Sequence, residues 1–293
     1  MRLRVFHRTE YDYESPVSAS YGQLYLLPRR AVGQEVVWSE LRIEPTPDSY
    51  NEFLDFYGNR AANFSVSSSH RRLTITATSE IDLTGRSIIS DDQFQSPTWE
   101  ATVQALKTSD DPDILETREF TFASPLIPKS EAISAYAFST FQPGRGLLAC
   151  VSEITARIHA DLEYQPGSTS LSTTPDDALS LRKGVCQDFA HLEIACLRSV
   201  GLAARYVSGY LETTPPPGEE RLQGADASHA WLSVFVPTIG WIDVDPTNNC
   251  FVGTRHICTA WGRDYGDVSP VKGVIFTDAR NTAMTVRVDV DHV

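Results

Sequence analysis

The chain has 293 residues, 41% hydrophobic and 10% aromatic, a composition typical of a globular protein and not of a disordered one. Its net charge of −13 argues against nucleic acid or an anionic membrane as a partner. No apolar run reaches the roughly 18 residues that suggest a membrane-spanning helix, and the N-terminus lacks the apolar stretch of a secretory signal. The five scattered cysteines contain no C-x-x-C pair, so we expect reduced thiols in the cytoplasm, with no disulfide frame, metal site or cofactor.

The length favours two domains over a single core. Residues 1–95 hold β-branched or alternating runs, separated by turn signals rich in proline and glycine. The runs lie at 2–6, 35–43 and 73–78. We therefore predict an N-terminal antiparallel β-sandwich over 1–95. Its tyrosines indicate either half-buried sheet or a substrate-binding surface, and they are Tyr11, Tyr13, Tyr21 and Tyr25.

Helical signals dominate the next part of the chain. A short helix is predicted from Ser130 to about 140, and a second, amphipathic one has apolar residues spaced by three and four at 148, 151, 154 and 158. Thr174 can cap a third helix, with Pro175 at its first position and Asp177 completing a capping box. That helix would lead to Gly184, whose freedom at positive φ would allow the turn that follows.

The stretch 184–201 contains the first chemical signal. Phe189, Leu192, Cys196 and Val200 share one helical face, and Gly201 stands where a helix C-terminus would place it. Cys186 therefore lies in the first turn, where free N–H groups and the helix dipole favour a thiolate. Cys186 is then a nucleophile if partners exist, and an ordinary buried thiol, as we expect for Cys196, if they do not.

Partners for the thiol are predicted downstream. Two apolar-alternating runs, 229–236 and 241–245, flank a Pro/Gly turn and indicate a β-hairpin. His229 opens the first strand and Asp245 closes the second, so the imidazole and the carboxylate can meet. A cysteine at a helix N-terminus, followed by histidine and aspartate on neighbouring strands, is the layout of a thiol triad. Asp243, with the same strand parity, and Asp226 are the rival acids.

Four ordered motifs in this region are specific. They are GVCQDFAH at 184–191, ARYVSGY at 204–210, HAW at 229–231 and GWIDVDPT at 240–247. Together they resemble the bacterial transglutaminase-like family, whose members are often described as candidate cysteine proteases. HRTEYDY at 7–13 with LLPR at 26–29 resembles its N-terminal β domain, and GRDYGDV at 262–268 its C-terminal return segment.

The resemblance implies an α+β fold in which a papain-like or transglutaminase core follows the β domain. The cysteine helix of this core packs on an antiparallel sheet that carries the histidine and the aspartate. We divide the chain into an N-terminal transglutaminase-associated β domain at 1–95 and a connector with helices at 96–145. The transglutaminase-like catalytic core then covers 146–250, and a C-terminal β return segment covers 251–293.

For the reaction we expect Cys186 to attack an acyl carbon, His229 to move protons and Asp245 to orient His229. Oxyanion or substrate contacts are expected from Tyr164, Gln187 and Trp231, although Trp231 also suits core packing. The resulting acyl-thioenzyme would be hydrolysed by water, as in a cysteine protease or amidase acting on a peptide or protein. The alternatives are transfer to a primary amine acceptor, as in a transglutaminase, biosynthetic acyl transfer, and a non-catalytic peptide-binding module.

Overall fold

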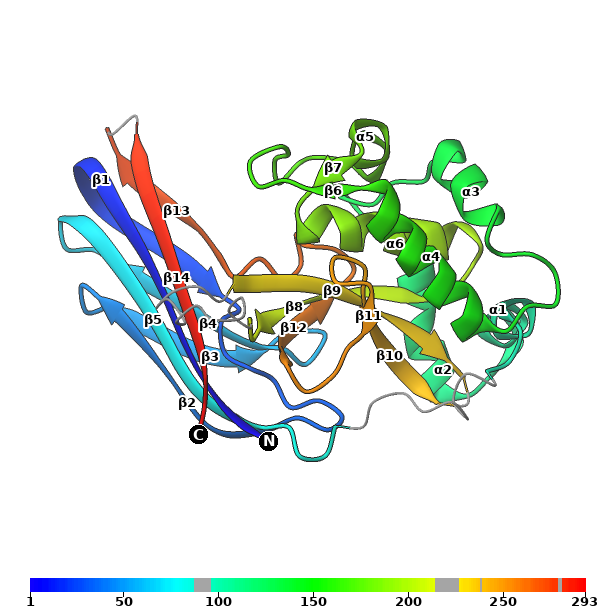
Figure 1. The fold of residues 1–293 in the computed structure, drawn as a ribbon. Coiled ribbons are helices and arrows are strands. Elements are labelled where there is room, and N and C mark those ends of the chain that lie inside the picture. Colours follow the sequence, from blue (N-terminus) through cyan, green and yellow to red (C-terminus); the bar gives the residue numbers. More distant parts are fainter. Residues whose placement is uncertain (87–95, 214–226, 238, 279–280) are drawn as a thin grey trace, which may run out of the picture.

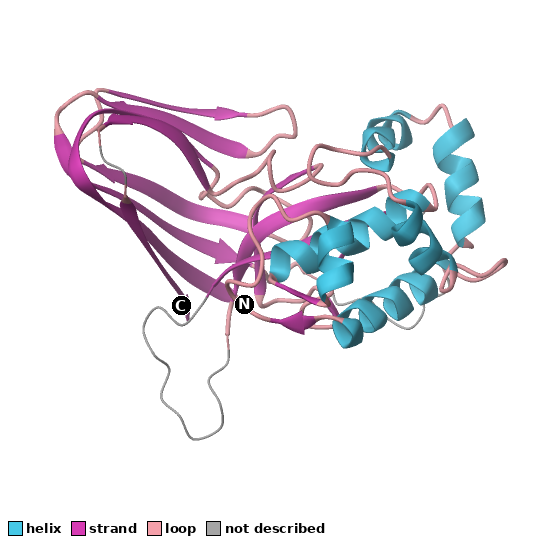
Figure 2. Cartoon of the chain, turned by 90° about the horizontal axis from the view of Figure 1, so that it is seen from above, coloured by secondary structure: helices cyan, strands magenta, loops and turns pink. Residues whose placement is uncertain are grey.

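The computed structural model describes residues 1–293 except 87–95, 214–226, 238 and 279–280. A β domain formed by both ends of the chain lies beside a domain of helices and sheet (Figure 1). Seen from above, the helices gather at the end of the molecule away from the β domain (Figure 2). This agrees with the predicted fold class.

The β domain is organised around one long strand, β1 (Arg2–Leu24). The first half of β1 pairs with β5 (His70–Asp82) and β14 (Thr282–His292). Its second half pairs with β4 (Arg60–Val66) and β13 (Val271–Thr277), all antiparallel. The outer strands are β2 (Glu35–Glu44), beside β5, and β3 (Ser49–Leu54), beside β4. The chain's last strands thus complete a sheet begun by its first residues.

Two halves of this sheet face each other across an apolar core. Ile43 and Ile75, from β2 and β5, belong to the same buried cluster as Phe64 and Val66 of β4. This arrangement agrees with the predicted β-sandwich. The four tyrosines do not form one surface, because Tyr13 and Tyr25 are buried, Tyr11 is half-buried and Tyr21 is exposed.

The second domain contains a five-stranded antiparallel sheet covered by helices. Its strand order is β11 (Cys250–Phe251), β10 (Gly240–Asp245), β9 (Ala227–Val236), β8 (Ala204–Leu211) and β12 (His256–Gly262). The helices are α1 (Trp99–Thr108), α2 (Pro112–Thr117), the 3-10 helix η2 (Arg118–Thr121), α3 (Glu131–Phe138), α4 (Leu147–Asp161), α5 (Pro175–Leu181) and α6 (Cys186–Ser199). A short parallel pair, β6 (Glu163–Tyr164) and β7 (Lys183–Gly184), precedes α6.

The helix α6 is central, packing on β8 and β9 and against α3, α4 and α5. Its expected apolar face is buried, but so are its polar residues Asp188, His191 and Glu193, so the helix is enclosed on all sides. The helix ends at Ser199, and Gly201 follows with φ 89°, where a helix C-terminus was expected to place a glycine. The N–H of Leu202 then donates to the Leu197 carbonyl at 3.0 Å.

The entry into α6 differs from the prediction in one respect. The capping box of Thr174 and Asp177 forms as expected at the start of α5. Gly184, however, is not among the residues with positive φ, and Arg182 takes that conformation instead, with φ 53°. Glycine is needed at 184 because an added Cβ would lie 2.7 Å from the Asp188 Cβ. The requirement is close packing and not a left-handed turn.

Glu193 is a carboxyl group enclosed between α6 and α4. Burial raises its pKa to about 8, against a hydrogen bond with Thr155 that lowers it. The Thr155 hydroxyl lies 2.8 Å from both Glu193 Oε1 and the Val151 carbonyl, and a hydroxyl has only one proton to give. A protonated Glu193 that donates to Thr155 satisfies both contacts.

We therefore expect Glu193→Gln to alter the pH dependence of stability. Folded wild type keeps the proton of Glu193 up to about pH 8, whereas the unfolded chain releases it near 4.5. The wild-type free energy of unfolding should thus fall as pH rises from about 4.5 to 8, and the variant should lack this slope. Urea unfolding at several pH values measures it, with exposed Glu163→Gln as control. Parallel wild-type and variant curves would contradict the assignment.

Candidate active site

Cys186 begins α6 and is only partly buried. Two contacts hold this helix start in place. The Asp188 carboxylate accepts a hydrogen bond from the Val185 N–H at 2.8 Å and one from the Thr169 hydroxyl at 2.6 Å. The pairing of Tyr164 with Gly184 ties the preceding residues to β6. The thiol is therefore fixed at the positive end of the helix dipole.

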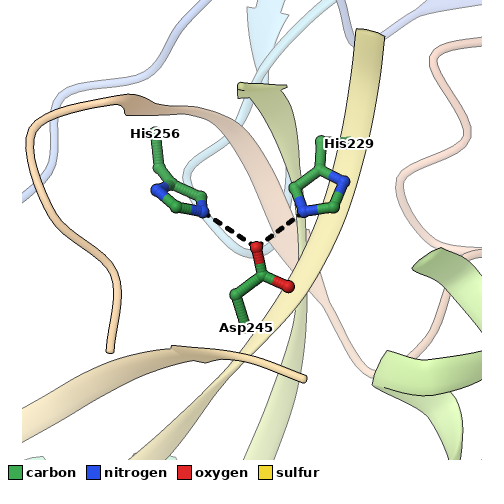
Figure 3. A group of neighbouring side chains, drawn as sticks. All are labelled: His229, Asp245 and His256. Atoms are coloured by element: carbon green, nitrogen blue, oxygen red, sulfur yellow. Dashed lines mark hydrogen bonds and ion pairs between the residues drawn. The ribbon is translucent and has the colours of Figure 1, made fainter. Parts of the chain in front are cut away.

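His229 and Asp245 meet because of the β9–β10 register. Val244 pairs with Leu232, so Asp245 at the end of β10 stands near the start of β9. His229 Nε2 donates to Asp245 Oδ2 at 2.7 Å, and both side chains are buried (Figure 3). The hairpin predicted from the sequence thus brings these two residues together.

The Asp245 carboxylate is fully buried and surrounded by donors. Oδ2 also accepts from Asn248 Nδ2 at 2.7 Å and from His256 Nε2 at 2.9 Å. Oδ1 accepts from the backbone N–H groups of Thr247 and Asn248, at 2.9 and 3.2 Å. Burial alone would raise the pKa of Asp245, but the hydrogen bonds from His229 and His256 outweigh it and hold this pKa well below its usual range. Asp245 is therefore a carboxylate at neutral pH.

His229 is held in its cationic form. Burial opposes a charge on its ring, but hydrogen bonds with Asp245 and with the Cys186 side chain outweigh burial and raise the pKa to about 10. Because Nε2 donates to Asp245, Nδ1 is the nitrogen that remains for the thiol, and it lies on the side of the ring away from Asp245 (Figure 3). The charged imidazole ring therefore faces the Cys186 side chain.

Asp243, the rival acid on the same strand, does not occupy this position. Asp243 bonds the Ser233 hydroxyl and accepts from Trp231 Nε1 at 3.3 Å, and its charge also acts on the buried Arg205. Asp226 lies outside the described residues. Within the described part of the chain, Asp245 is the carboxylate that bonds His229.

The three residues expected to contact the oxyanion or the substrate have different surroundings. Tyr164 is 52% exposed. Partial burial raises the pKa of its phenol, and the charge of the nearby Cys186 raises it further. Gln187 is buried, and its Nε2 donates to the Leu171 carbonyl at 3.3 Å. Trp231 is fully buried and packs its ring against His256, so it offers no surface to a substrate. The substrate role expected for Trp231 is corrected to a packing role.

Three neighbours of the site were not singled out from the sequence. His256 and Asn248 both donate hydrogen bonds to Asp245. The third neighbour is Tyr206, a buried phenol. Its pKa is raised well above its usual value, first by burial and then by the charge of Cys186. The only local signal was for Asn248, directly after the DPT motif. His256 comes from β12, on the far edge of the sheet, and no local pattern places it near Asp245.

The group His229, Asp245 and His256 has the composition of a metal site, with ligand atoms within 4.8 Å of one another. However, Asp245 Oδ2 contacts both Nε2 atoms at hydrogen-bond distances of 2.7 and 2.9 Å. A metal ion would need those nitrogens without their protons, at about 2.0–2.1 Å from itself. The observed geometry is a hydrogen-bonded cluster.

Comparison with known proteins shows the family to which the chain belongs. Residues 3–82 match the bacterial transglutaminase-like N-terminal region, and residues 135–246 match the transglutaminase-like superfamily core. An uncharacterized protein of Mycobacterium tuberculosis is 42% identical over 295 aligned positions, covering 99% of this chain and 92% of that protein. The chain belongs to the transglutaminase-like superfamily. Members of this superfamily are typically cysteine-based enzymes.

Two further relatives extend the comparison. A crystal structure of a candidate cysteine protease from Cytophaga hutchinsonii has the same fold, with a TM-score of 0.76 at 23% identity, covering 100% of this chain and 92% of that chain. A protein-glutamine gamma-glutamyltransferase of Pseudomonas aeruginosa is 33% identical over 84 residues, 28% of this chain and 13% of that protein. None of the helices in the described residues of this superfamily member has the length and apolar character needed to cross a membrane.

Within this superfamily member, Cys186 should be the most reactive thiol. Burial raises the pKa of the other four cysteines, to about 11 for Cys250 and about 12 for Cys258. Cys186 instead faces the His229 imidazolium, so we expect it to be alkylated at least about tenfold faster at pH 7. Limited iodoacetamide labelling with peptide mapping measures this, and equal or slower labelling of Cys186 would refute it.

Proposed function

We propose that this protein is a thiol hydrolase that cleaves peptide or amide bonds through an acyl-thioenzyme on Cys186. The observation that carries the proposal is the chain of contacts from Cys186 at a helix N-terminus through the His229 ring to the buried Asp245 carboxylate. Cysteine at a helix start with a paired imidazole supplies a thiolate near neutral pH.

In the acylation step the Cys186 thiolate attacks the carbonyl carbon, and the C=O electron pair moves onto oxygen. The oxyanion is met by the Cys186 N–H, which has no intrahelical partner at the first turn, and by the Tyr164 hydroxyl. When the intermediate collapses, the C–N bond breaks and the His229 imidazolium gives its proton to the leaving amine. Asp245 holds the ring with Nδ1 directed at the reacting atoms.

In the second step neutral His229 accepts a proton from water, which attacks the thioester carbon. The C–S bond breaks, a free carboxylate leaves, and the thiolate–imidazolium pair is restored. Water is the default acceptor unless a site excludes it. Peptides or proteins are the proposed substrates. We place the reaction in the cytoplasm, because a reducing compartment preserves the thiolate from oxidation.

A second outcome shares the same first step. If a primary amine attacks the thioester, the product is a new amide, as in a transglutaminase. The similarity of 84 residues to a protein-glutamine gamma-glutamyltransferase favours this alternative. The same residues serve both reactions, so the acceptor distinguishes them.

The test is a product analysis on peptides derived from a bacterial proteome, incubated in heavy-oxygen water with and without a millimolar primary amine. We expect new carboxylates that carry the heavy oxygen, even with amine present, and none with Cys186→Ala. If amide products dominate instead, the reaction is acyl transfer to an amine and not hydrolysis. No new product of either kind, from an enzyme whose Cys186 is reactive, would favour a peptide-binding module.

A further inference from the structure

We propose that His256 is a positioning residue of this site: as a neutral N–H donor it shares the Asp245 carboxylate with His229 and thereby sets how strongly Asp245 holds the His229 proton. The inference rests on the proposed thiol chemistry but concerns the state of the thiol–imidazole pair before any substrate binds.

The geometry is specific. His256 Nε2 donates to Asp245 Oδ2 at 2.9 Å, and His229 Nε2 donates to the same oxygen at 2.7 Å, from the opposite side (Figure 3). His256 is 3% exposed, and its ring packs edge-to-face with that of the buried Trp231 at a centroid distance of 5.2 Å. From the turn that follows β5, the Arg86 side chain donates to the His256 carbonyl. The ring is thus held from several elements.

His256 is suited to donate only one proton. Its Nδ1 is buried and has no hydrogen-bond partner among the residues that the structure describes. A cationic ring would need an acceptor at Nδ1, and burial lowers the pKa of His256 despite its bond to Asp245. The charged or titratable groups that act on His256 or on its acceptor are Asp245, His229, Arg86, Cys250 and Glu193. Asp245 is the anion that His256 contacts directly, and the nearby cations disfavour a second positive ring.

The consequence for the reaction follows because His229 and His256 share one carboxylate, that of Asp245. Each hydrogen bond that a carboxylate accepts makes it less basic. Without His256, Asp245 would attract the His229 proton more strongly, so His229 would lose that proton only at higher pH and would give it less readily to a leaving amine. His256 thus keeps His229 able to act in both directions, as an acid in acylation and as a base in deacylation.

The test compares two substitutions of similar length, His256→Gln, whose amide can still donate to Asp245, and His256→Met, which cannot. For each we would follow the pH dependence of Cys186 alkylation by iodoacetamide, which needs no substrate. The alkaline limb of this pH profile is the pH range in which His229 loses its proton. In His256→Met this limb should move to higher pH by on the order of one unit. His256→Gln should restore it toward the wild-type value. On a substrate, kcat should fall about tenfold in His256→Met with little change in KM, and recover in His256→Gln.

A purely structural role predicts a different pattern. Both variants would then lose stability without moving the alkaline limb, or would move it equally, and either result would overturn the proposal. If His256→Met does not fold, His256→Asn, whose amide is too short to reach Asp245, replaces it in the comparison. Because alkylation reports on the resting pair, absence of peptide hydrolysis would remove the proposed function without deciding the role of His256.

Discussion

Cys186→Ala is expected to abolish turnover while leaving the fold intact. Cys186 is the attacking atom of the proposed reaction, so its loss should reduce kcat by about 10⁵–10⁶-fold. Its side chain is only partly buried at a helix start, so the free energy of unfolding should change by only about 1 kcal/mol. Steady-state kinetics and urea unfolding measure the two effects. Cys250→Ala, which removes a thiol of similar exposure, is the control and should retain activity.

His229→Ala should be nearly as damaging as the loss of the thiol. The two residues act as a unit, so combining both substitutions should cost little more than either alone. Losses of activity that multiply in the double variant would show that Cys186 and His229 act independently, contrary to the proposed mechanism.

Asp245→Asn should also be severe, although less damaging than the loss of Cys186 or His229. The amide places an NH₂ group where Asp245 accepts from His229, His256 and Asn248, so the imidazole loses the acceptor that fixes its tautomer. We expect kcat to fall by about 10³–10⁴-fold. Leaving buried donors unpaired should also cost about 2–3 kcal/mol of stability. Kinetics and denaturant unfolding measure both.

Asp243→Asn is the matched control, because Asp243 lies on the same strand and face but bonds Trp231 and Ser233. Its activity should stay within about tenfold of wild type. If Asp243→Asn were the more damaging variant, the acid would be wrongly assigned.

The pH dependence of the free energy of unfolding should further distinguish Asp245→Asn from Asp243→Asn. The pKa of Asp245 is held low, so its contribution to stability is present above the unfolded value near 3.8 and is lost as pH falls through the folded value. His229 has the opposite sign: its contribution is complete below about 6.5 and is lost as pH rises through about 10. Asp245→Asn should weaken both dependences, and Asp243→Asn should leave both in place.

The parts of this site that could be predicted are those set by short-range patterns. Spacing placed Cys186 at a helix start, and a hairpin with a fixed register brought His229 to Asp245. The choice of Asp245 over Asp243 needed the family's motif, because both share one face of β10. His256 could not be predicted, since its ring reaches Asp245 only after β12 has joined the opposite edge of the sheet beside β8.

In the fold, too, features set by local sequence patterns could be predicted, and features set by tertiary contacts could not. Runs of β-branched residues indicated the strands of the β domain, but the pairing of β13 and β14 with β1 depends on contacts between residues 247 to 289 positions apart, from Leu24 with Val271 to Leu3 with His292. Enclosure of α6 on all sides, and hence the burial of Glu193, was not visible in its helical periodicity. The reason for glycine at 184 was likewise tertiary, a close approach to Asp188.

The most direct test of the central claim, an acyl-thioenzyme on Cys186, is rapid mixing with 4-nitrophenyl acetate. We expect a burst of about one nitrophenolate per protein chain, with the acetyl group mapped to Cys186 after acid quenching and no burst from Cys186→Ala. An equal burst from Cys186→Ala, or acetyl groups mapped to other residues only, would contradict the account.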